Sequence, residues 1–298
     1  MKWQDLVRGE QVIDSSSLSD PVLIRADGTY LYTLPSCVDD IDMNITHVVR
    51  GEDHVANTGA QIQIFEALGG TLPQFAHTNL LVSASGEGFS KRLGSLSIGT
   101  LAEQGLEALS VAIHAVLIGT SQSVAPVENM DALADIFDFS KVSRAPARFD
   151  VEELYALNQR IVQSLDFESV KDRLKNLLGK DDIEAAFWNA ISGNIRFLKD
   201  AKEWDDVVYG SITPQMDDDD RDFIAQAAQL LPEGDFTQAT WGEWTNMLKN
   251  ETGRKGRALF MPLRKILTGR EDGPSLDALL PLIGRKEAEI RLHAPLAR

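Results

Sequence analysis

The stretch Thr46-His47-Val48-Val49-Arg50-Gly51-Glu52-Asp53-His54 decides the fold of this chain. Val48 and Val49 give it strand character, and a dense set of charged and titratable residues follows them directly. Open α/β sheets bind ligands where a strand ends in polar residues just before a helix, because side chains and free backbone N–H groups converge there. Taken alone, the stretch also fits a solvated surface turn. The segments around it decide between these two interpretations.

Those segments predict alternating strands and helices. Short strands are expected over 22–25, 46–50 and 75–82, and 30–38 is ambiguous by periodicity. A helix is predicted over 57–70, capped by Asn57 or Thr58 and ended by Gly69-Gly70. The first 20 residues resemble the end of a preceding structure and have no obvious partner among themselves. This order is typical of a doubly wound parallel sheet, but about three strands make only half of a nucleotide-binding domain.

Beyond residue 98 the hydrophobic pattern is helical. One helix is predicted over 101–119, where Gly119 can end it, and Asp150 can cap the next. Further helices are expected over 170–178, 182–198, 218–231, 241–250, 257–267, 276–283 and 286–292. The sequence therefore predicts an α/β part, the second half of a doubly wound (Rossmann-like) sheet, followed by an all-α part.

Composition sets the broad class of the protein. The chain has 298 residues, of which 43% are hydrophobic and 25% charged, as in an ordinary globular protein of about two domains. It contains no apolar run of about 18 residues, and its first residues lack the apolar centre of a signal peptide, so we expect a cytoplasmic protein with no membrane partner. The single cysteine, Cys37, excludes an internal disulfide and a multi-cysteine zinc site, and we expect it to be a small buried residue.

The net charge of −16 argues against a polyanionic partner, but the charges are unevenly distributed. Basic residues cluster between Arg254 and Arg270, while Asp217 to Asp220 form an acidic run. We interpret the acidic run as a solvated loop flanking a helix, and the basic cluster either as a nucleic-acid-binding face or as a solvated amphipathic helix.

A second candidate site is the loop Gly86-Glu87-Gly88-Phe89-Ser90-Lys91-Arg92, which follows a predicted strand. Its glycines allow it to fold over a triphosphate, and Lys91 can then meet the charge that develops when a phosphoryl bond breaks. A plain surface loop is about equally consistent with this spacing. The interpretation as a phosphate-binding loop is stronger because the stretch from Arg50 to His54 precedes this loop by one strand.

Several sequence motifs of this chain occur together in one known family. They are Val22-Leu23-Ile24-Arg25-Ala26-Asp27-Gly28-Thr29, Val38-Asp39-Asp40-Ile41-Asp42-Met43-Asn44 continuing to His54, Phe89-Ser90-Lys91-Arg92, Ala145-Pro146-Ala147-Arg148-Phe149-Asp150 with Leu157-Asn158, and Thr252-Gly253-Arg254-Lys255-Gly256-Arg257 with Pro262-Leu263-Arg264 and Leu267-Thr268-Gly269. With them the chain resembles the bacterial glutamyl-tRNA synthetases, which are class I aminoacyl-tRNA synthetases. The resemblance runs from end to end, and its portion from Val38 to His54 is the most specific.

The resemblance implies a reaction and a set of site residues. In that family glutamate and ATP, the latter bound with Mg²⁺, give glutamyl-adenylate, and the glutamyl group then passes to the terminal ribose of the tRNA. Tyr32, Ser36 and Arg50 would line the glutamate pocket, where an arginine fork suits a carboxylate. ATP and the end of the tRNA would contact Glu52, Asp53, His54, Lys91 and Arg92, and the catalytic pair would be Ser90 and Lys91. Glu52 and Asp53 also suit a helix N-terminus without any ligand.

The resemblance also implies a domain order and partners. Residues 1–21 would end an acceptor-stem-binding insertion, 22–96 would be the second half of the catalytic domain, 97–149 a helical stem-contact region, and 150–298 an all-helical anticodon-binding domain. Candidates for contact with the anticodon region are Arg254, Lys255, Arg257 and Arg264. The expected partner is tRNA(Glu), with tRNA(Gln) left open, and no protein-bound metal is expected.

Two features depart from the family pattern. Gly88 replaces the first lysine of the usual Lys-Met-Ser-Lys-Ser loop, and no phrase like His-Ile-Gly-His occurs in the chain. Because the second phrase lies in the first half of the nucleotide-binding fold, its absence agrees with the missing strands. We therefore expect a C-terminal part of a longer synthetase that is inactive in glutamate activation by itself. The alternatives are a truncated paralogue acting as a tRNA-binding or protein-interaction module, and an unrelated nucleotidyltransferase.

Overall fold

The computed structural model describes residues 1–14, 16, 19–83, 86 and 97–296. The chain divides into two compact units. Unit 1 comprises Met1–Gln104 and Ala108–Leu157, and unit 2 comprises Gly105–Glu107 and Asn158–Arg298. No helix in the described part of the chain combines the length and the apolar character that crossing a membrane requires.

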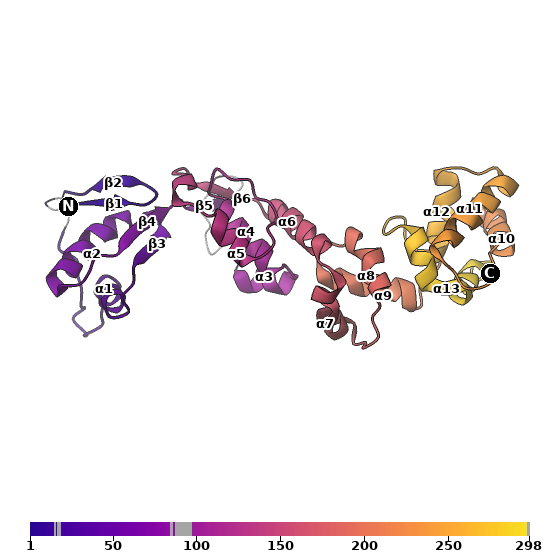
Figure 1. Cartoon of the computed structure of the whole chain (residues 1–298), viewed down its shortest axis with the longest axis horizontal. Coiled ribbons are helices and arrows are strands. Elements are labelled where there is room, and N and C mark those ends of the chain that lie inside the picture. The colour runs from indigo at the N-terminus through magenta and orange to yellow at the C-terminus, as the bar shows by residue number, and fades with distance from the viewer. Residues whose placement is uncertain (15, 17–18, 84–85, 87–96, 297–298) are drawn as a thin grey trace. The chain divides into compact units, whose positions relative to one another are not determined.

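Unit 1 is built on a small sheet with the strand order β2-β1-β4-β3 (Figure 1). Its strands are β1 (Lys2–Asp5), β2 (Gly9–Val12), β3 (His47–Gly51) and β4 (Gln74–Thr78). β4 pairs in parallel with both β1 and β3, while β2 runs antiparallel to β1. The helices α1 (Thr33–Asp42) and α2 (Val55–Leu68) pack against each other. The parallel sheet confirms the predicted α/β class.

The N-terminal hairpin of β1 and β2 corrects the sequence prediction, which found no partner for this segment. The Asp5 carboxylate accepts hydrogen bonds from the backbone N–H groups of Val7 at 3.0 Å and Arg8 at 2.9 Å, so it closes the turn. Gly9 then adopts a φ of 72°, which favours glycine. Such a local turn lets a polar segment form strands without a strong apolar alternation.

Two of the strand predictions are wrong: one segment is not a strand, and the other contains two separate strands. The segment 22–25 forms a single bridge, from Ile24 to Tyr30, and Val22 is 62% exposed, because the described residues place no strand beside it. The segment 75–82 is divided into β4 and β5 (Leu81–Ser83), and β5 pairs in parallel with β6 (Ala147–Phe149) in a second sheet. Between them the Asn79 side chain donates to the carbonyls of Gly119 and Ala145, which fixes the change of direction.

Helix boundaries in unit 1 follow the predictions in part. α2 ends at Gly69 with a φ of 69°, as predicted, but it begins at Val55, so Asn57 and Thr58 lie inside the helix and are not its caps. The predicted helix over 101–119 is two helices, α3 (Ile98–Gln104) and α4 (Ala108–Leu117), because Gly105 adopts a φ of 91° between them. The unit also contains α5 (Met130–Ile136) and the 3-10 turn η3 (Phe139–Lys141).

All regular elements in the described part of unit 2 are helices, as predicted. The helix α6 (Val151–Ser164) contributes its first residues to unit 1 and its last residues to unit 2. Its start is stabilised by the Asp150 carboxylate, which accepts a hydrogen bond from the Glu152 N–H at 2.9 Å. The further elements of unit 2 are α7 (Phe167–Leu178), α8 (Ala185–Ile191), η4 (Ser192–Asn194), η5 (Leu198–Asp200), α9 (Ala201–Tyr209), η6 (Asp218–Asp220), α10 (Arg221–Gln229), α11 (Gln238–Thr252), α12 (Arg257–Thr268) and α13 (Leu276–His293). The predictions missed α9, but the predicted break within α13 is present, because Gly284 has non-helical angles.

Replacing Gly273 by alanine should destabilise unit 2 by about 1–3 kcal/mol. A Cβ at this position would lie 2.0 Å from the ring of the buried Trp204, and the φ of 126° is unfavourable for any other residue. The matched control is Gly242→Ala in the middle of α11, where a Cβ has no atom within 4 Å and should stabilise by about 0.5–1 kcal/mol. Urea denaturation followed by tryptophan fluorescence checks both, and equal shifts for the two variants would contradict the packing argument.

Candidate functional site

The candidate site lies at the carboxyl ends of three neighbouring parallel strands. Arg50 in β3 is directly opposite His77 in β4, and Asp5, the last residue of β1, is opposite Phe75. Because the three strands run in parallel, their ends meet at one edge of the sheet, where α/β proteins bind ligands. The α2 helix follows β3 after the single 3-10 turn η2 (Glu52–His54) and supplies two further polar side chains.

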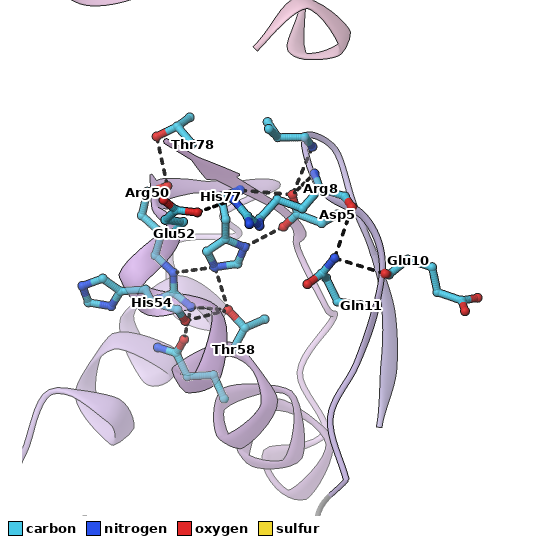
Figure 2. A network of polar contacts seen from close by, with 12 residues as sticks. Asp5, Arg8, Glu10, Gln11, Arg50, Glu52, His54, Thr58, His77 and Thr78 are labelled. Atoms are coloured by element: carbon cyan, nitrogen blue, oxygen red, sulfur yellow. Dashed lines mark hydrogen bonds and ion pairs between the residues drawn. The ribbon is translucent and has the colours of Figure 1, made fainter. Parts of the chain in front are cut away.

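The guanidinium group of Arg50 forms the centre of the site. Its Nη1 donates to the hydroxyl of Tyr32 at 3.0 Å, and its Nη2 donates to Thr58 Oγ1 and Gln61 Oε1, both at 2.6 Å. Its Nε donates to His77 Nε2 at 3.3 Å. Figure 2 shows the Arg50 side chain among His77, Thr58 and the start of α2. Four hydrogen bonds thus fix the plane of the arginine, while Tyr32 remains 53% exposed beside it.

The partners of Arg50 on α2 are buried polar residues. Thr58 and Gln61 are 0% and 2% exposed, and their spacing of three residues places both on one face of the helix. The Gln61 side-chain amide also donates to Ser36 Oγ at 2.9 Å, which links α1 to the site. Ser36 therefore reaches Arg50 only through Gln61. The neighbouring Cys37 is fully buried, as predicted, and burial raises the pKa of its thiol to about 11.

Behind Arg50 lies a buried pair formed by His77 and Asp5. His77 Nδ1 lies 2.6 Å from Asp5 Oδ2, and the two residues are 0% and 1% exposed. Burial lowers the pKa of His77, although the neighbouring Asp5 opposes this effect. Burial raises the pKa of Asp5, but hydrogen bonds from the backbone of Arg8 and from His77 outweigh it, so the pKa is lowered overall. The pair is therefore a neutral imidazole against an ionised carboxylate.

The charged residues after Arg50 have distinct surroundings. Glu52 forms an ion pair with Arg8, so its carboxylate is turned toward the β1–β2 hairpin. Asp53 is exposed, and its Oδ2 lies 4.0 Å from Nε2 of His54. The ring of His54 packs edge-on against Tyr32 with 5.6 Å between the centroids, and its Nδ1 lies 3.2 Å from the Asn57 amide.

The structure therefore brings Tyr32, Arg50 and His54 together and places Ser36 one hydrogen bond away. The predicted residues Ser90, Lys91 and Arg92 lie outside the described residues. Within the described part of the chain, no group of three His, Cys, Asp or Glu side chains is arranged to hold a metal ion.

Sequence reasoning missed five residues of this network. They are Asp5, Arg8, Thr58, Gln61 and His77. A signal was present for His77, which follows the apolar Phe75 and Ala76 in a predicted strand, because a histidine buried in such a strand needs a hydrogen-bond partner. Polar residues on the inner face of α2 gave a second signal. For Asp5 the sequence offers none, because its role depends on the pairing of β1 with β4.

The acidic run is largely exposed and directly precedes α10, as predicted, but two of its carboxylates also partly neutralise the predicted basic cluster in unit 2. Arg254 forms an ion pair with Asp220 and stacks over Phe223 at 4.4 Å, and Lys265 binds Asp217 at 2.9 Å. The Arg264 Nη2 donates to the Pro274 carbonyl at 3.0 Å, and burial lowers the pKa of its guanidinium. Lys255 and Arg257 are exposed, and among the described residues neither has a carboxylate within ion-pair distance.

Lowering the pH from about 7.5 to about 5.5 should destabilise unit 1, by up to about 1.4 kcal/mol for each of two histidines. Burial lowers the pKa of His77, and it also lowers that of His114 despite the nearby Glu153. In the unfolded chain both return to about 6.5 and take up protons that the folded unit excludes, so stability is lost as the pH falls through that value. Urea titrations followed by the amide signals of Phe75 and Ala76 check this, and equal midpoints at both pH values would contradict it.

The sequence of this chain matches two families of known protein domains. Residues 1–156 match the family "tRNA synthetases class I (E and Q), catalytic domain", and residues 167–296 match "Anticodon binding domain". The chain is 54% identical over 292 residues to glutamate–tRNA ligase 2 of Hyphomonas neptunium and 53% identical over 295 residues to glutamate–tRNA ligase 2 of Methylorubrum populi. These alignments cover 98% and 99% of this chain but 65% of each relative, so the chain spans less than two thirds of their length.

Solved structures show the same fold. A glutamate tRNA ligase from Elizabethkingia meningosepticum, in complex with its amino acid, superposes with a TM-score of 0.82 at 23% identity. A glutamate-tRNA synthetase from Elizabethkingia anophelis superposes with a TM-score of 0.80 at 24% identity. Each match covers 100% of this chain and 66% of the other. By its sequence and fold, this chain belongs to the class I tRNA synthetases of the glutamate and glutamine group, of which it carries part of the catalytic domain and an anticodon-binding domain.

Proposed function

We propose that this chain is part of a glutamate–tRNA ligase, which joins glutamate to tRNA(Glu) through glutamyl-adenylate and releases AMP and pyrophosphate. The names of its relatives and the family of its N-terminal part support this proposal. The observation that carries it is the arrangement of Arg50 and Tyr32 at the carboxyl edge of the parallel sheet. We expect the ligase to act in the cytoplasm.

The hydrogen-bond count of Arg50 supports a carboxylate ligand. A guanidinium has five N–H donors, and four of those of Arg50 have acceptors among the described residues. The remaining donor is on Nη1, beside Tyr32. Because the Tyr32 oxygen accepts from Nη1, its own O–H is available to donate outward. These two donors converge on the exposed side of the site and suit the side-chain carboxylate of glutamate.

The residues around this pair suit the other substrates. His54 packs on Tyr32, and Asp53 is exposed beside it, so we assign both to the ATP and tRNA end of the site. Glu52 forms an ion pair with Arg8, and this ion pair would have to open before Glu52 could contact ATP directly. From the resemblance alone, Ser90, Lys91 and Arg92 would bind the phosphates of ATP, which brings its own Mg²⁺.

The experiment is ATP–pyrophosphate exchange dependent on glutamate and tRNA(Glu). It compares the chain alone with the chain joined to the further portion that its relatives have, which we expect to be N-terminal; the joined protein is referred to below as the completed ligase. We expect exchange by the completed ligase and none by the chain alone, because one edge of the sheet provides only one wall of the site. Exchange by the chain alone would show that the additional portion is unnecessary. A completed ligase that charges no tRNA with glutamate would contradict the proposed function.

A second candidate function is a tRNA-binding module, which the match of 167–296 to an anticodon-binding domain favours. The exposed Lys255 and Arg257 are its best cationic candidates. Filter binding of tRNA(Glu) and tRNA(Gln) at two salt concentrations tests the module, with Lys255→Glu and Arg257→Glu together as the charge-reversed variant. Arg285→Glu in α13 is the control, since Arg285 pairs with Glu289. Binding that tolerates the double reversal would remove both residues from the interface.

A further inference from the structure

The Asp5–His77 pair is a deeply buried pair of titratable groups in unit 1, and nothing in the proposed reaction uses it directly. Both side chains are at most 1% exposed, so neither can touch a substrate. We propose that Asp5 and His77 are positioning residues, which hold the guanidinium of Arg50 in its carboxylate-binding orientation by fixing which nitrogen of His77 carries the proton. This inference rests on the proposed function, because it concerns the glutamate pocket.

The carboxylate of Asp5 is the fixed end of this arrangement. Its Oδ1 accepts backbone N–H groups from Val7 at 3.0 Å, Arg8 at 2.9 Å and His77 at 3.2 Å. Its Oδ2 lies 2.6 Å from His77 Nδ1. Two backbone donors from the β1–β2 turn and one from β4 leave the carboxylate no freedom to rotate. An ionised carboxylate can only accept, so His77 must carry its proton on Nδ1.

The opposite nitrogen of His77 is consequently an acceptor. Nε2 lies 3.3 Å from Arg50 Nε and 2.9 Å from Thr58 Oγ1 (Figure 2). Arg50 Nε–H is a donor in every state of the arginine, so it requires a lone pair on the imidazole. With the proton on Nε2 instead, two N–H groups would face each other in a buried site, which is unfavourable. Arg50 Nε–H can therefore donate to the imidazole only when Nε2 of His77 carries no proton.

The hydrogen bond of Arg50 Nε to His77 matters for recognition of the glutamate carboxylate because it sets the orientation of the guanidinium plane. Nε, Nη1 and Nη2 lie in one rigid plane, so fixing Nε on His77 and Nη2 on Thr58 and Gln61 determines where Nη1 points. Nη1 carries the donor that we assign to the glutamate carboxylate. A small rotation of the plane would move this donor away from the Tyr32 hydroxyl with which it forms the binding fork.

The first test uses the chain itself and does not depend on activity. In 15N-labelled protein, the His77 ring should show a protonated Nδ1 and an unprotonated Nε2, and the Arg50 Nε–H signal should be protected from exchange. Asp5→Asn keeps the shape and the Oδ1 acceptor but presents an amide N–H to the ring. It should move the proton to Nε2 and expose the Arg50 Nε–H. A protonated Nε2 in the unsubstituted chain would overturn the proposal.

The second test measures steady-state kinetics in the completed ligase. Asp5→Asn should raise the KM for glutamate roughly tenfold or more, as for loss of a hydrogen bond to a charged group, while the KM for ATP changes less than about twofold. In an Arg50→Ala background the same substitution should have no further effect on the KM for glutamate, because its target is gone. An equal effect in both backgrounds would overturn the proposal.

A matched control separates positioning from stability. His114 is a second buried histidine of unit 1, 2% exposed and packed on Phe149 at 5.0 Å between ring centroids. His114→Gln should lower the stability of unit 1 but leave the KM for glutamate unchanged. If it raised this KM as much as Asp5→Asn does, the effect would be general loosening and the proposal would fail. A completed ligase that does not activate glutamate would instead contradict the proposed function, while the ring and Nε–H signals would still decide the role of Asp5.

Discussion

Replacing Arg50 by alanine should raise the KM for glutamate by about 30-fold to about 1000-fold in the completed ligase, which corresponds to about 2–4 kcal/mol. The loss has two parts. The substrate carboxylate loses its charged donor, and the acceptors that Arg50 now satisfies on Thr58, Gln61 and His77 lose a partner inside the protein. We assign ATP to other side chains of the site, so the KM for ATP should change little.

The control for this prediction is Arg25→Ala, since Arg25 is an exposed arginine of the same unit whose backbone forms the turn with Thr29. Initial-rate measurements of ATP–pyrophosphate exchange at varied glutamate concentration give the KM for both variants. A KM for glutamate within about twofold of the unsubstituted value for Arg50→Ala, well below the range above, would exclude Arg50 from the pocket. Arg50→Lys should recover only part of the loss, because lysine keeps the charge but lacks the planar fork.

Replacing Trp244 by alanine should destabilise unit 2 by about 3–5 kcal/mol. Trp244 is fully buried in α11, and its indole Nε1 donates to the Ala227 carbonyl in α10 at 3.1 Å. Trp241 packs edge-on against it at 6.0 Å between ring centroids. Removing the side chain leaves a cavity between helices and an unpaired carbonyl, and both effects lower the free energy of unfolding.

Met247→Ala is the matched control, because Met247 lies one turn along the same helix and is 38% exposed. Its substitution should change stability by less than about 0.5 kcal/mol. Urea denaturation with circular dichroism at a helical wavelength measures both variants, and the amide spectrum of unit 1 shows whether the loss is confined to unit 2. Similar losses for the two variants would mean that this helix face does not hold the core.

The sequence predicts the elements of this chain best where one local signal decides them. Gly69 and Gly284 end helices because they adopt positive φ, and Asp150 caps α6 through its own carboxylate. It predicts less where pairing between distant segments decides. β1 pairs with the distant β4, and β2 in turn pairs with β1, whereas the apolar segment 22–25 has no neighbouring strand among the described residues.

The same distinction applies to the site. Arg50 and Tyr32 were predictable from the charged strand end and the family resemblance, and the structure brings them within 3.0 Å of each other. The residues that hold them were not predictable in the same way. Asp5 is 72 residues from His77 along the chain, and no local pattern around Met1-Lys2-Trp3-Gln4-Asp5 indicates that its carboxylate is buried.

The ion pairs of Asp217 with Lys265 and of Asp220 with Arg254 have a consequence for the thermodynamics of RNA binding. In solution these carboxylates act as covalently attached counterions, and they are not released into the solvent when a phosphate approaches. The dependence of affinity on salt concentration should therefore count only cations without such a neighbour, such as Lys255 and Arg257. A chain with a basic cluster of this size would then bind RNA with a shallower salt dependence than its lysines and arginines suggest, and with less attraction for polyanions in general.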